Sequence, residues 1–307
     1  MELIEQLVAK KIIPTCPLNL PLLKEKKIEA DVLRLDAIHQ VVSGNKWFKL
    51  KYYLSSASEK KIKTIVTYGG AYSNHILATA FAASESGFKS VGIIRGERPK
   101  VLSDTLKNSL QYGMQLEFLS REDYKNKTSS GFQEKIIEKF TSSLIIPEGG
   151  AGEEGVRGSM EILELVDKSK YSTIACAAGT GTMFAGLANA SLLQQFILGI
   201  SVVKSGKGAI WPFIERFVRA EKIKFCEISD HYHFGGYAKK TDELISFMNQ
   251  FYDQTGIPTD FVYTAKMFYA ILDLAHNDFF VPGSRILVIH SGGLQGNHSL
   301  PTNKLKF

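Results

Sequence analysis

The feature that most constrains the fold of this chain is a repeated alternation between short apolar runs and longer amphipathic stretches, which begins near residue 63 and continues almost to the C-terminus. Short apolar runs are typical of strands that are buried on both faces, and the longer stretches have the spacing of helices. Strands that alternate with helices build parallel sheets. The sequence therefore predicts an α/β protein whose parallel sheets are covered by helices on both faces.

The expected strands lie at residues 64–68, 90–94, 116–119, 144–146, 173–177, 197–203, 225–228 and 285–289. The expected helices lie at residues 73–86, 102–112, 153–167, 183–193, 210–218, 242–255 and 265–275. Turns that contain glycine follow four of the strands, at residues 69–70, 149–150, 179–181 and 292–293. Because the carboxyl ends of parallel strands share one edge of a sheet, where ligands bind, these turns predict one composite site.

The composition is typical of a globular protein without a membrane partner. Hydrophobic residues make up 44% and charged residues 22% of the 307 residues, which is enough for one large or two ordinary domains. No apolar run approaches the roughly 20 residues needed to cross a bilayer. The N-terminus contains Glu2 and Glu5, and it lacks the basic start and apolar middle of a signal peptide.

Three cysteines, Cys16, Cys176 and Cys226, are too few and too widely spaced for a disulfide framework or a metal site. Cys176 lies in an apolar run, so we expect it to be buried as a small hydrophobic residue. Free cysteines are typical of a reducing compartment. The sequence therefore favours a cytoplasmic protein that holds no metal ion.

The net charge of the chain is +6, which is modest for its length. Pairs of lysines at residues 10–11, 26–27 and 60–61 are interrupted by apolar or acidic residues and form no dense basic stripe. A nucleic-acid partner is therefore not expected. A mildly positive field would instead help to attract an anionic phosphate or carboxylate.

The first candidate motif, at residues 43–50, places Lys46 directly after Gly44 and Asn45 at the start of an amphipathic stretch. The positive end of a helix dipole disfavours a lysine ammonium group there, and burial lowers its pKa further. A neutral lysine amine can form a Schiff base with an aldehyde. Lys46 is therefore a candidate attachment site, although most lysines are solvated surface residues.

The second motif, at residues 67–75, follows an expected strand and begins an expected helix. Its glycines allow the backbone to approach a ligand, and Ser73 or Asn74 can cap the helix. Backbone N–H groups at such a helix start bind anions, and a substrate carboxylate fits here. An ordinary helix cap is the alternative interpretation, and His75 taken alone is interpreted as a packed or capping residue.

The third motif, at residues 178–183, also joins an expected strand to an expected helix. Its small residues leave backbone amides available to hold a phosphate group. It is not a P-loop, since no Gly-Lys-Ser/Thr follows, and Phe184 replaces the third glycine of a dinucleotide-binding turn. The phosphate of a mononucleotide or of pyridoxal 5′-phosphate (PLP) suits it better.

Taken together, the motifs resemble the family of 1-aminocyclopropane-1-carboxylate (ACC) deaminases and D-cysteine desulfhydrases. The matching segments are Gly-Asn-Lys at 44–46, Gly-Gly-x-x-Ser-Asn-His at 69–75, Pro-Glu-Gly-Gly at 147–150, the glycine loop at 179–187, Gly-Gly-Tyr at 235–237, Val-Tyr-Thr-Ala-Lys at 262–266 and Ile-His-Ser-Gly-Gly at 289–293. Each is weak alone, but they follow the family order over most of the chain. The resemblance implies the tryptophan synthase β-subunit fold, fold type II of the PLP enzymes, with PLP as cofactor.

The resemblance also implies a role for each candidate residue. Lys46 bonds PLP, and Asn74 hydrogen-bonds its phenolic oxygen. Ser73 and the adjoining backbone receive the substrate carboxylate beside His75, and Ser73 assists proton transfer. Tyr237 and Tyr263 face the substrate, where Tyr263 acts as acid, base or positioning group; core packing is the alternative for both. The backbone amides that hold the phosphate belong to Gly179, Thr180, Gly181, Thr182 and Met183.

Some positions depart from the family pattern. Phe48 replaces the arginine that is usual two residues after the cofactor lysine, which removes a charge near the site. Thr182 stands where many relatives have glycine, and Met183 stands where they have threonine. These changes leave the backbone amides in place, so we expect PLP binding to survive, while the identity of the substrate stays open.

The architecture implied by the resemblance has two domains. A smaller domain spans residues 50–150, and a larger one combines residues 1–49 with residues 151–307. The cofactor would lie in the cleft between them, a favoured place for ligands. The resemblance also implies a homodimer.

Position 264 bears on the reaction. ACC deaminases carry glutamate after the tyrosine that matches Tyr263, whereas this chain has Thr264. A carboxylate keeps the pyridine nitrogen of PLP protonated and strongly electron-withdrawing, but a hydroxyl from Thr264 or Ser291 leaves it neutral. Elimination of a sulfur leaving group needs less electron withdrawal by the cofactor ring than the ring opening of ACC does. The motif that contains His75 is also closer to the desulfhydrase version. We therefore expect α,β-elimination of the D-cysteine type, with ACC deamination to 2-oxobutanoate and ammonia as the alternative.

Two other classes of function stay open. A PLP-binding protein without efficient turnover would keep Lys46 and the phosphate loop, and Phe48 and Met183 are the features that favour it. A nucleotide-dependent transferase would use the loop at residues 179–183. The absence of a Walker lysine and of an acidic pair for Mg²⁺ in the sequence argues against this last class.

Overall fold

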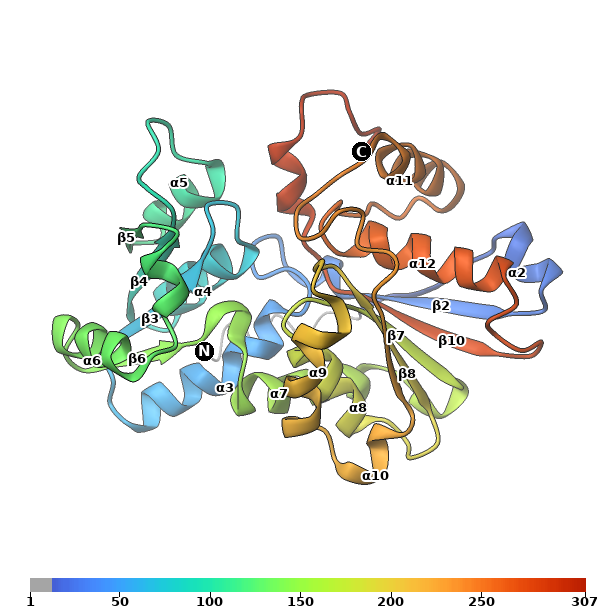
Figure 1. Ribbon diagram of the computed structural model, residues 1–307, viewed down its shortest axis with the longest axis horizontal. Coiled ribbons are helices and arrows are strands. Elements are labelled where there is room, and N and C mark those ends of the chain that lie inside the picture. Colours follow the sequence, from blue (N-terminus) through green and yellow to red (C-terminus); the bar gives the residue numbers. More distant parts are fainter. Residues whose placement is uncertain (1–12) are drawn as a thin grey trace.

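Two separate sheets organise the structure, a computed structural model that describes residues 13–307 (Figure 1). The smaller sheet has the strand order β5-β4-β3-β6, and the larger sheet has the order β1-β2-β10-β7-β8-β9. Among the described strands, every pairing is parallel except that of β1 with β2. The predicted α/β class with parallel sheets is therefore confirmed.

The smaller sheet lies on the left of Figure 1 and packs helices on both faces. On β3, Ile65 contacts the helices that cover one face, while Val66 and Tyr68 point to the other face. The strands are β3 (Thr64–Gly69), β4 (Lys89–Arg95), β5 (Met114–Leu119) and β6 (Ser143–Ile146). The helices are α3 (Lys46–Glu59), α4 (Asn74–Glu85), α5 (Asp104–Gln111) and α6 (Ser130–Lys139).

The larger sheet lies between two helical layers, with α2, α11 and α12 on one side and α7 to α10 on the other (Figure 1). Its strands are β1 (Thr15–Pro17), β2 (Glu29–Arg34), β7 (Thr173–Ala178), β8 (Phe196–Ser201), β9 (Cys226–Ser229) and β10 (Arg285–His290). Its helices are α2 (Pro21–Glu25), α7 (Glu153–Met160), α8 (Thr182–Ala190), α9 (Gly206–Phe217), α10 (Ala220–Ile223), α11 (Asp242–Thr255) and α12 (Thr264–His276).

Alternation along β7 shows why a continuous apolar run became a central strand. Ile174 and Cys176 belong to the cluster that α7, α8 and α9 cover, while Ala175 and Ala177 belong to the cluster under α2 and α12. Because successive side chains point to opposite faces, a strand covered on both sides must be apolar at every position. Cys176 is fully buried, as predicted.

The structure differs from the sequence-based assignment at several elements, and the short helices α2 and α10 were not predicted. Strands β1 and β2 were not predicted, because charged residues interrupt the apolar run of β2; one of them, Asp31, accepts a hydrogen bond from the Tyr171 hydroxyl at 2.8 Å. The helix expected at residues 153–167 ends at Met160 and continues as a 3₁₀ helix at Glu161–Leu165. The tighter winding places Ile162 and Leu163 in the core.

Other sequence-based expectations stay predictions. The smaller sheet takes all its strands from residues 64–146, but the proposed domain boundaries are untested, and residues 1–12 lie outside the described part.

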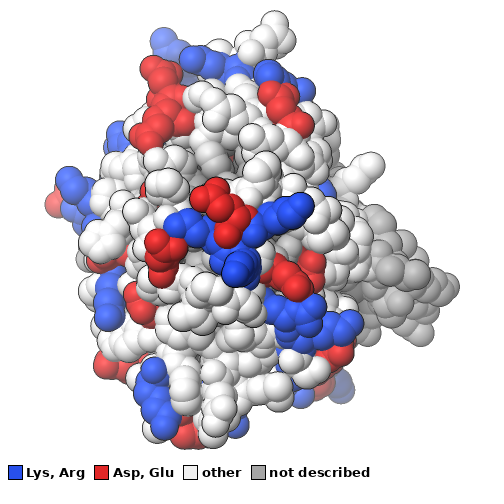
Figure 2. Space-filling view, turned by 90° about the vertical axis from the view of Figure 1, so that its right-hand side faces the viewer, with Lys and Arg blue, Asp and Glu red and all other residues white. Residues whose placement is uncertain are grey.

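No described helix is both long enough and apolar enough to cross a membrane. The end of the larger sheet that carries the ion pairs Lys26–Asp278 and Arg285–Glu29 shows both signs of charge interspersed (Figure 2).

Candidate active site

A close backbone contact places the start of α3 at the carboxyl end of β10. The Asn45 N–H donates a hydrogen bond to the Ser291 carbonyl oxygen at 3.2 Å. Gly44 has a φ of +70°, and a Cβ atom at this position would overlap that carbonyl oxygen. Only glycine combines this conformation with this contact. Lys46, the first residue of α3, is thereby fixed at the sheet edge where the sequence predicted a ligand site.

The Lys46 amine is held among polar and aromatic groups. Its Nζ donates to the Asn45 Oδ1 at 2.6 Å and lies 5.9 Å from the centre of the Tyr263 ring. Burial lowers the pKa of Lys46 to about 8, although the charge of Asp260 opposes the shift. About a tenth of this amine is therefore neutral at pH 7, far more than for an ordinary lysine, and the neutral form is the one that attaches covalently to an aldehyde.

Lys49 is a second buried lysine, which the sequence analysis missed. It lies one helical turn after Lys46 and is 7% exposed. Burial and then the charge of Lys46 lower the pKa of Lys49 to about 7. No carboxylate within the described residues forms an ion pair with it. A buried cation without a protein counter-ion is a natural anion-binding group, and the three-residue spacing from Lys46 was the only signal in the sequence.

The beginning of α4 brings three predicted residues to the same place. The Ser73 Oγ accepts a hydrogen bond from the Ile76 N–H at 3.4 Å, so Ser73 caps the helix. The Oδ1 of Asn74 and the Nδ1 of His75 are buried and have no hydrogen-bond partner among the described residues. Buried polar atoms of this kind usually bind a ligand or water.

His75 is neutral and its tautomer follows from its neighbours. Burial, then the charges of Lys46 and Lys49, lower the pKa of His75 to about 3. The Thr67 hydroxyl donates to the Ile146 carbonyl at 2.9 Å, so it accepts from the His75 Nε2 at 2.8 Å. The proton therefore sits on Nε2, and Nδ1 is an acceptor. His75, the second residue of α4, is thus an uncharged hydrogen-bond acceptor.

The glycine loop before α8 has the geometry of an anion cradle. Gly181 caps α8 with a φ of +82°, and the hydroxyls of Thr180 and Thr182 lie 2.8 Å apart. Met183 does not crowd the loop, because its Sδ accepts a hydrogen bond from the Asn45 Nδ2 at 3.1 Å. The substitution noted in the sequence therefore leaves the first-turn amides available for a phosphate.

Two predicted tyrosines face the same region. The rings of Tyr237 and Tyr263 meet edge to face, with centroids 6.0 Å apart. Burial and then the neighbouring Tyr237 hold the pKa of Tyr263 well above its ordinary value. A Cβ on Gly179 would lie 3.2 Å from the Tyr263 ring, so that ring covers the glycine loop. Lys266 holds the preceding loop by donating to the carbonyls of His233 at 2.9 Å and Gly236 at 2.8 Å.

Thr264 is hydrogen-bonded to Asp260, a buried carboxylate that the sequence analysis missed. The Thr264 hydroxyl donates to Asp260 Oδ1 at 2.8 Å and accepts from the Asp260 N–H at 2.8 Å. Asp260 also accepts the N–H groups of Val262, Tyr263 and Thr264. Its carboxylate thus caps α12 with four hydrogen bonds. The Ser291 hydroxyl forms no hydrogen bond to a described side chain or backbone group, and the roles assigned to Thr264 and Ser291 stay predictions.

These groups together fit an aldehyde that carries a phosphate, as PLP does. A lysine with a lowered pKa, a second buried cation, loop amides and an unpaired Asn74 oxygen converge from both sheets.

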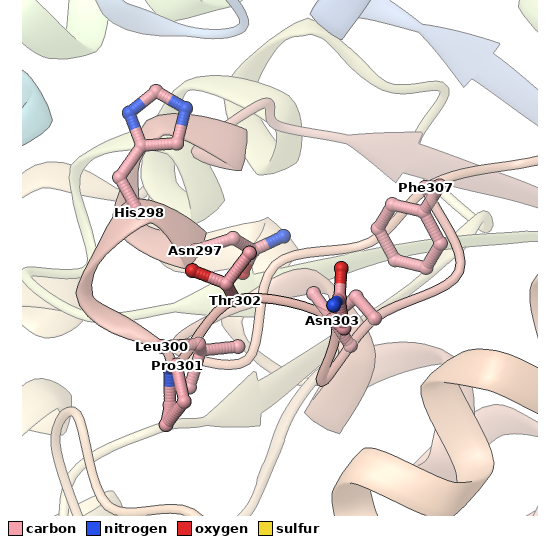
Figure 3. Close-up of a pocket in the computed structure, with 8 residues that line it drawn as sticks. Asn297, His298, Leu300, Pro301, Thr302, Asn303 and Phe307 are labelled. Carbon is pink, nitrogen blue, oxygen red and sulfur yellow. The ribbon is translucent and has the colours of Figure 1, made fainter.

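Figure 3 shows a hollow that is lined by other residues than those of the candidate site. It encloses about 330 Å³ between Asn297 and Phe307, and no lysine or carboxylate lines it. Within residues 13–307 there is also no cluster of residues that could hold a metal ion.

Comparisons with known proteins indicate the family and the fold of this chain. The family model described as "Pyridoxal-phosphate dependent enzyme" matches residues 10–292. A "Putative 1-aminocyclopropane-1-carboxylate deaminase" of Thermotoga maritima is 32% identical over 283 residues, which are 86% of this chain and 88% of that protein. The mitochondrial "Bifunctional D-cysteine desulfhydrase/1-aminocyclopropane-1-carboxylate deaminase" of Arabidopsis thaliana is 27% identical and covers 86% of this chain and 72% of that protein.

A solved structure described as an ACC deaminase homologue has a TM-score of 0.77 and 26% identity, and the match covers 96% of this chain and 95% of that one. Serine racemase of Dictyostelium discoideum, at 15% identity and a TM-score of 0.67 over 95% of this chain and 96% of that one, shares the fold. The predicted fold type II architecture is therefore confirmed.

Proposed function

The chain belongs to the family of pyridoxal-phosphate dependent enzymes that includes ACC deaminases and D-cysteine desulfhydrases, and on this premise we propose that it catalyses α,β-elimination of D-cysteine. In the overall reaction, D-cysteine and water give pyruvate, ammonia and hydrogen sulfide. The α-proton and the thiol group leave the amino acid, and water replaces its amine.

The residues of the site are divided between holding the cofactor and holding the substrate. Lys46 is the attachment point, Lys49 and the amides at residues 179–183 hold the phosphate, and Asn74 bonds the phenolic oxygen. PLP, when bound, withdraws electrons from the α-carbon of an attached amino acid. The N–H groups at the start of α4, next to Ser73, bind the substrate carboxylate.

Proton transfer and hydrogen bonding are divided between groups whose pKa values differ. Lys46, with a pKa of about 8, is suited to accept the α-proton near neutral pH. Tyr263, whose pKa is raised by burial, keeps its proton and can donate a hydrogen bond to the sulfur, which leaves as hydrosulfide. Ser73 and Tyr237 stay candidates for assisting these two steps.

The observation that carries the choice of reaction is the Asp260–Thr264 pair. Position 264 offers a hydroxyl instead of a carboxylate, and the proton of that hydroxyl is bound by Asp260. The Asp260 oxygens in turn accept four hydrogen bonds. Among the described residues, position 264 therefore offers the pyridine nitrogen no carboxylate, and the Asp260 carboxylate is already engaged in these bonds. A weaker electron sink suffices when the substrate has a good sulfur leaving group.

ACC deamination is the second candidate, and the names of the relatives favour it. The relatives from Thermotoga maritima and Pyrococcus furiosus are named for this activity, and the Arabidopsis thaliana relative is named for both. Ring opening would convert ACC and water into 2-oxobutanoate and ammonia. PLP binding without efficient turnover is the remaining alternative.

Steady-state assays with D-cysteine, ACC, D-serine and L-serine test the proposal. We expect the highest kcat/KM with D-cysteine, measured as pyruvate and sulfide release. Turnover of ACC alone would reverse the ranking, and bound cofactor without turnover of any substrate would support the binding-only alternative.

The cofactor attachment is tested with a matched pair of variants. Lys46→Ala should lose the absorbance near ~410–420 nm that lysine-bound PLP gives, whereas Lys60→Ala, at the exposed end of α3, should keep it. Unchanged absorbance in the Lys46 variant would refute the attachment.

A further inference from the structure

A buried group of charged side chains lies beside the turn at residues 291–293. The Asp36 carboxylate is 4% exposed and accepts two hydrogen bonds from the Arg34 guanidinium, from Nε at 2.8 Å and from Nη2 at 2.6 Å. The Nδ1 of His290, whose side chain is fully buried, lies 3.2 Å from the Asp36 Oδ1. Strand pairing brings the group together, because Arg34 on β2 lies opposite His290 on β10.

The imidazole of His290 is held at both of its nitrogens. Its Nε2 lies 2.8 Å from the carbonyl oxygen of Pro258, which only accepts hydrogen bonds, so Nε2 carries a proton. Its Nδ1 faces the Asp36 carboxylate and also the Gly292 N–H, whose nitrogen is 3.3 Å away. The imidazole therefore connects β2 with the turn that follows β10.

Asp36 also contacts the loop that leads to Lys46. Its backbone carbonyl oxygen accepts a hydrogen bond from the Ser43 hydroxyl at 3.1 Å. Asn45 belongs to the same loop, and its N–H donates to the Ser291 carbonyl at 3.2 Å. The loop and the turn that meet at this bond are thus both held by Asp36, the loop through its backbone and the turn through its carboxylate and His290.

A buried ionic group of this kind is a weak source of stability, which indicates another role. Taking charges out of water is costly, and apolar side chains of similar volume in the same place are often as stable or more stable. A buried polar network does favour one geometry, because its members are satisfied in one arrangement only. The group at Asp36 therefore favours a role in positioning its neighbours.

We propose that Asp36 and His290 are positioning residues, which hold the turn at residues 291–293 against the loop at residues 43–45 and thereby keep the Lys46 amine buried. The inference rests on the proposed attachment of PLP to Lys46 and adds two residues that act on it only through the backbone. Without this pair the turn separates from the loop, and water reaches the amine. Burial is the main cause of the lowered pKa of Lys46, so that pKa should then rise towards its ordinary value.

The test uses the cofactor-free protein. Trace acetic anhydride acetylates neutral amines, and mass spectrometry follows the acetylation of Lys46 against pH, relative to the exposed Lys60. The wild-type midpoint should lie near pH 8. His290→Leu should raise it by about one pH unit or more, and so should the double variant Arg34→Met/Asp36→Leu, which removes the ion pair without leaving a buried charge unpaired.

Two further variants separate positioning from a general loss of packing. His290→Asn retains an amide that can donate to Asp36, so its midpoint should stay closer to that of the wild type than to that of His290→Leu. Tyr171→Phe is the matched control, because it removes a hydrogen bond to Asp31 at an earlier position on the same strand and should leave the midpoint unchanged. In the PLP-loaded enzyme, His290→Leu should lower kcat with D-cysteine about tenfold or more and change KM less than about threefold.

Circular dichroism melting identifies the variants that are folded. An unchanged Lys46 midpoint in folded His290→Leu or in the folded double variant would overturn the proposal. An equal rise in Tyr171→Phe, or a rise in His290→Asn as large as in His290→Leu, would overturn it as well. If PLP does not attach to Lys46 or no amino acid is turned over, the proposed function fails, while the midpoints in the cofactor-free protein still decide the role of Asp36 and His290.

Discussion

Replacing Lys49 by methionine should stabilise the protein without cofactor and weaken the binding of PLP. In the cofactor-free protein, burial forces the pKa of Lys49 from an ordinary 10.5 down to about 7. Because each tenfold change in proton affinity is worth about 1.4 kcal/mol, this burial costs roughly 4 kcal/mol at pH 7. Methionine has a similar length and no charge, so its free energy of unfolding should be higher by part of this amount.

The phosphate of PLP should make the buried Lys49 ammonium group favourable where it is unfavourable in the cofactor-free protein. In the proposed binding mode, a dianion next to the Lys49 ammonium replaces the missing counter-ion, and charge-assisted hydrogen bonds of this kind are worth about 1.5–3 kcal/mol. The dissociation constant of PLP should therefore rise about tenfold to a hundredfold in the variant. Lys46 remains available for covalent attachment in both proteins.

The pH dependence gives an independent check. Below pH 7 both folded and unfolded wild type carry a protonated Lys49, so the full cost of burial is present. Between about pH 7 and 10.5 the folded state has lost this proton and the unfolded state still binds it, so wild-type stability rises with pH. The advantage of Lys49→Met should thus be largest at pH 7 or below and should disappear towards pH 10.5.

Urea unfolding of the cofactor-free proteins and titration with PLP, followed by absorbance, measure both effects. Lys51→Met is the matched control on the same helix, because Lys51 is paired with Glu161 at 2.5 Å near the surface. A Lys49→Met protein that is less stable than the wild type at pH 7, or that binds PLP with unchanged affinity, would refute the reasoning.

Three further predictions follow from contacts around the site. Lys266→Met should release the loop that carries Tyr237 and raise KM more than it alters the cofactor absorbance, and Lys266→Arg should restore part of the loss. Gly44→Ala should lower the free energy of unfolding by about 3 kcal/mol or more in a urea titration, because a Cβ meets the Ser291 carbonyl; a change below about 1 kcal/mol would contradict this. His75→Gln should leave the shape of the pH–rate profile between pH 5 and 9 unchanged, since the pKa of His75 is about 3.

The sequence predicted those features that depend on local pattern. The strands of β7 and β10 are continuous apolar runs, so their two-sided burial is visible in the sequence. Strand β2 was missed because Glu29, Asp31 and Arg34 break its run. Glu29 and Asp31 bind Arg285 and Tyr171, which lie far away in the sequence. Periodicity does not reveal long-range partners of charged residues.

Features of the site that depend on burial could not be predicted. Lys49 is one of many lysines in the sequence, and its buried state depends on the segments that pack around α3. Asp260 was likewise missed, because an aspartate before a helix is an ordinary cap, and only its geometry shows that it captures the Thr264 hydroxyl. The contact of Met183 with Asn45 likewise joins residues that are far apart in the sequence, so no local pattern indicates it.

The lysine that is proposed to carry the cofactor is positioned by main-chain atoms, through the bond from the Asn45 amide to the Ser291 carbonyl and the tight approach of Gly44 to Gly292. Side-chain replacements nearby, such as the phenylalanine at position 48, do not alter this bond. A lineage can therefore exchange the groups that select the amino acid without displacing the atom that holds the cofactor. We expect substrate preference to diverge faster in such enzymes than the attachment itself.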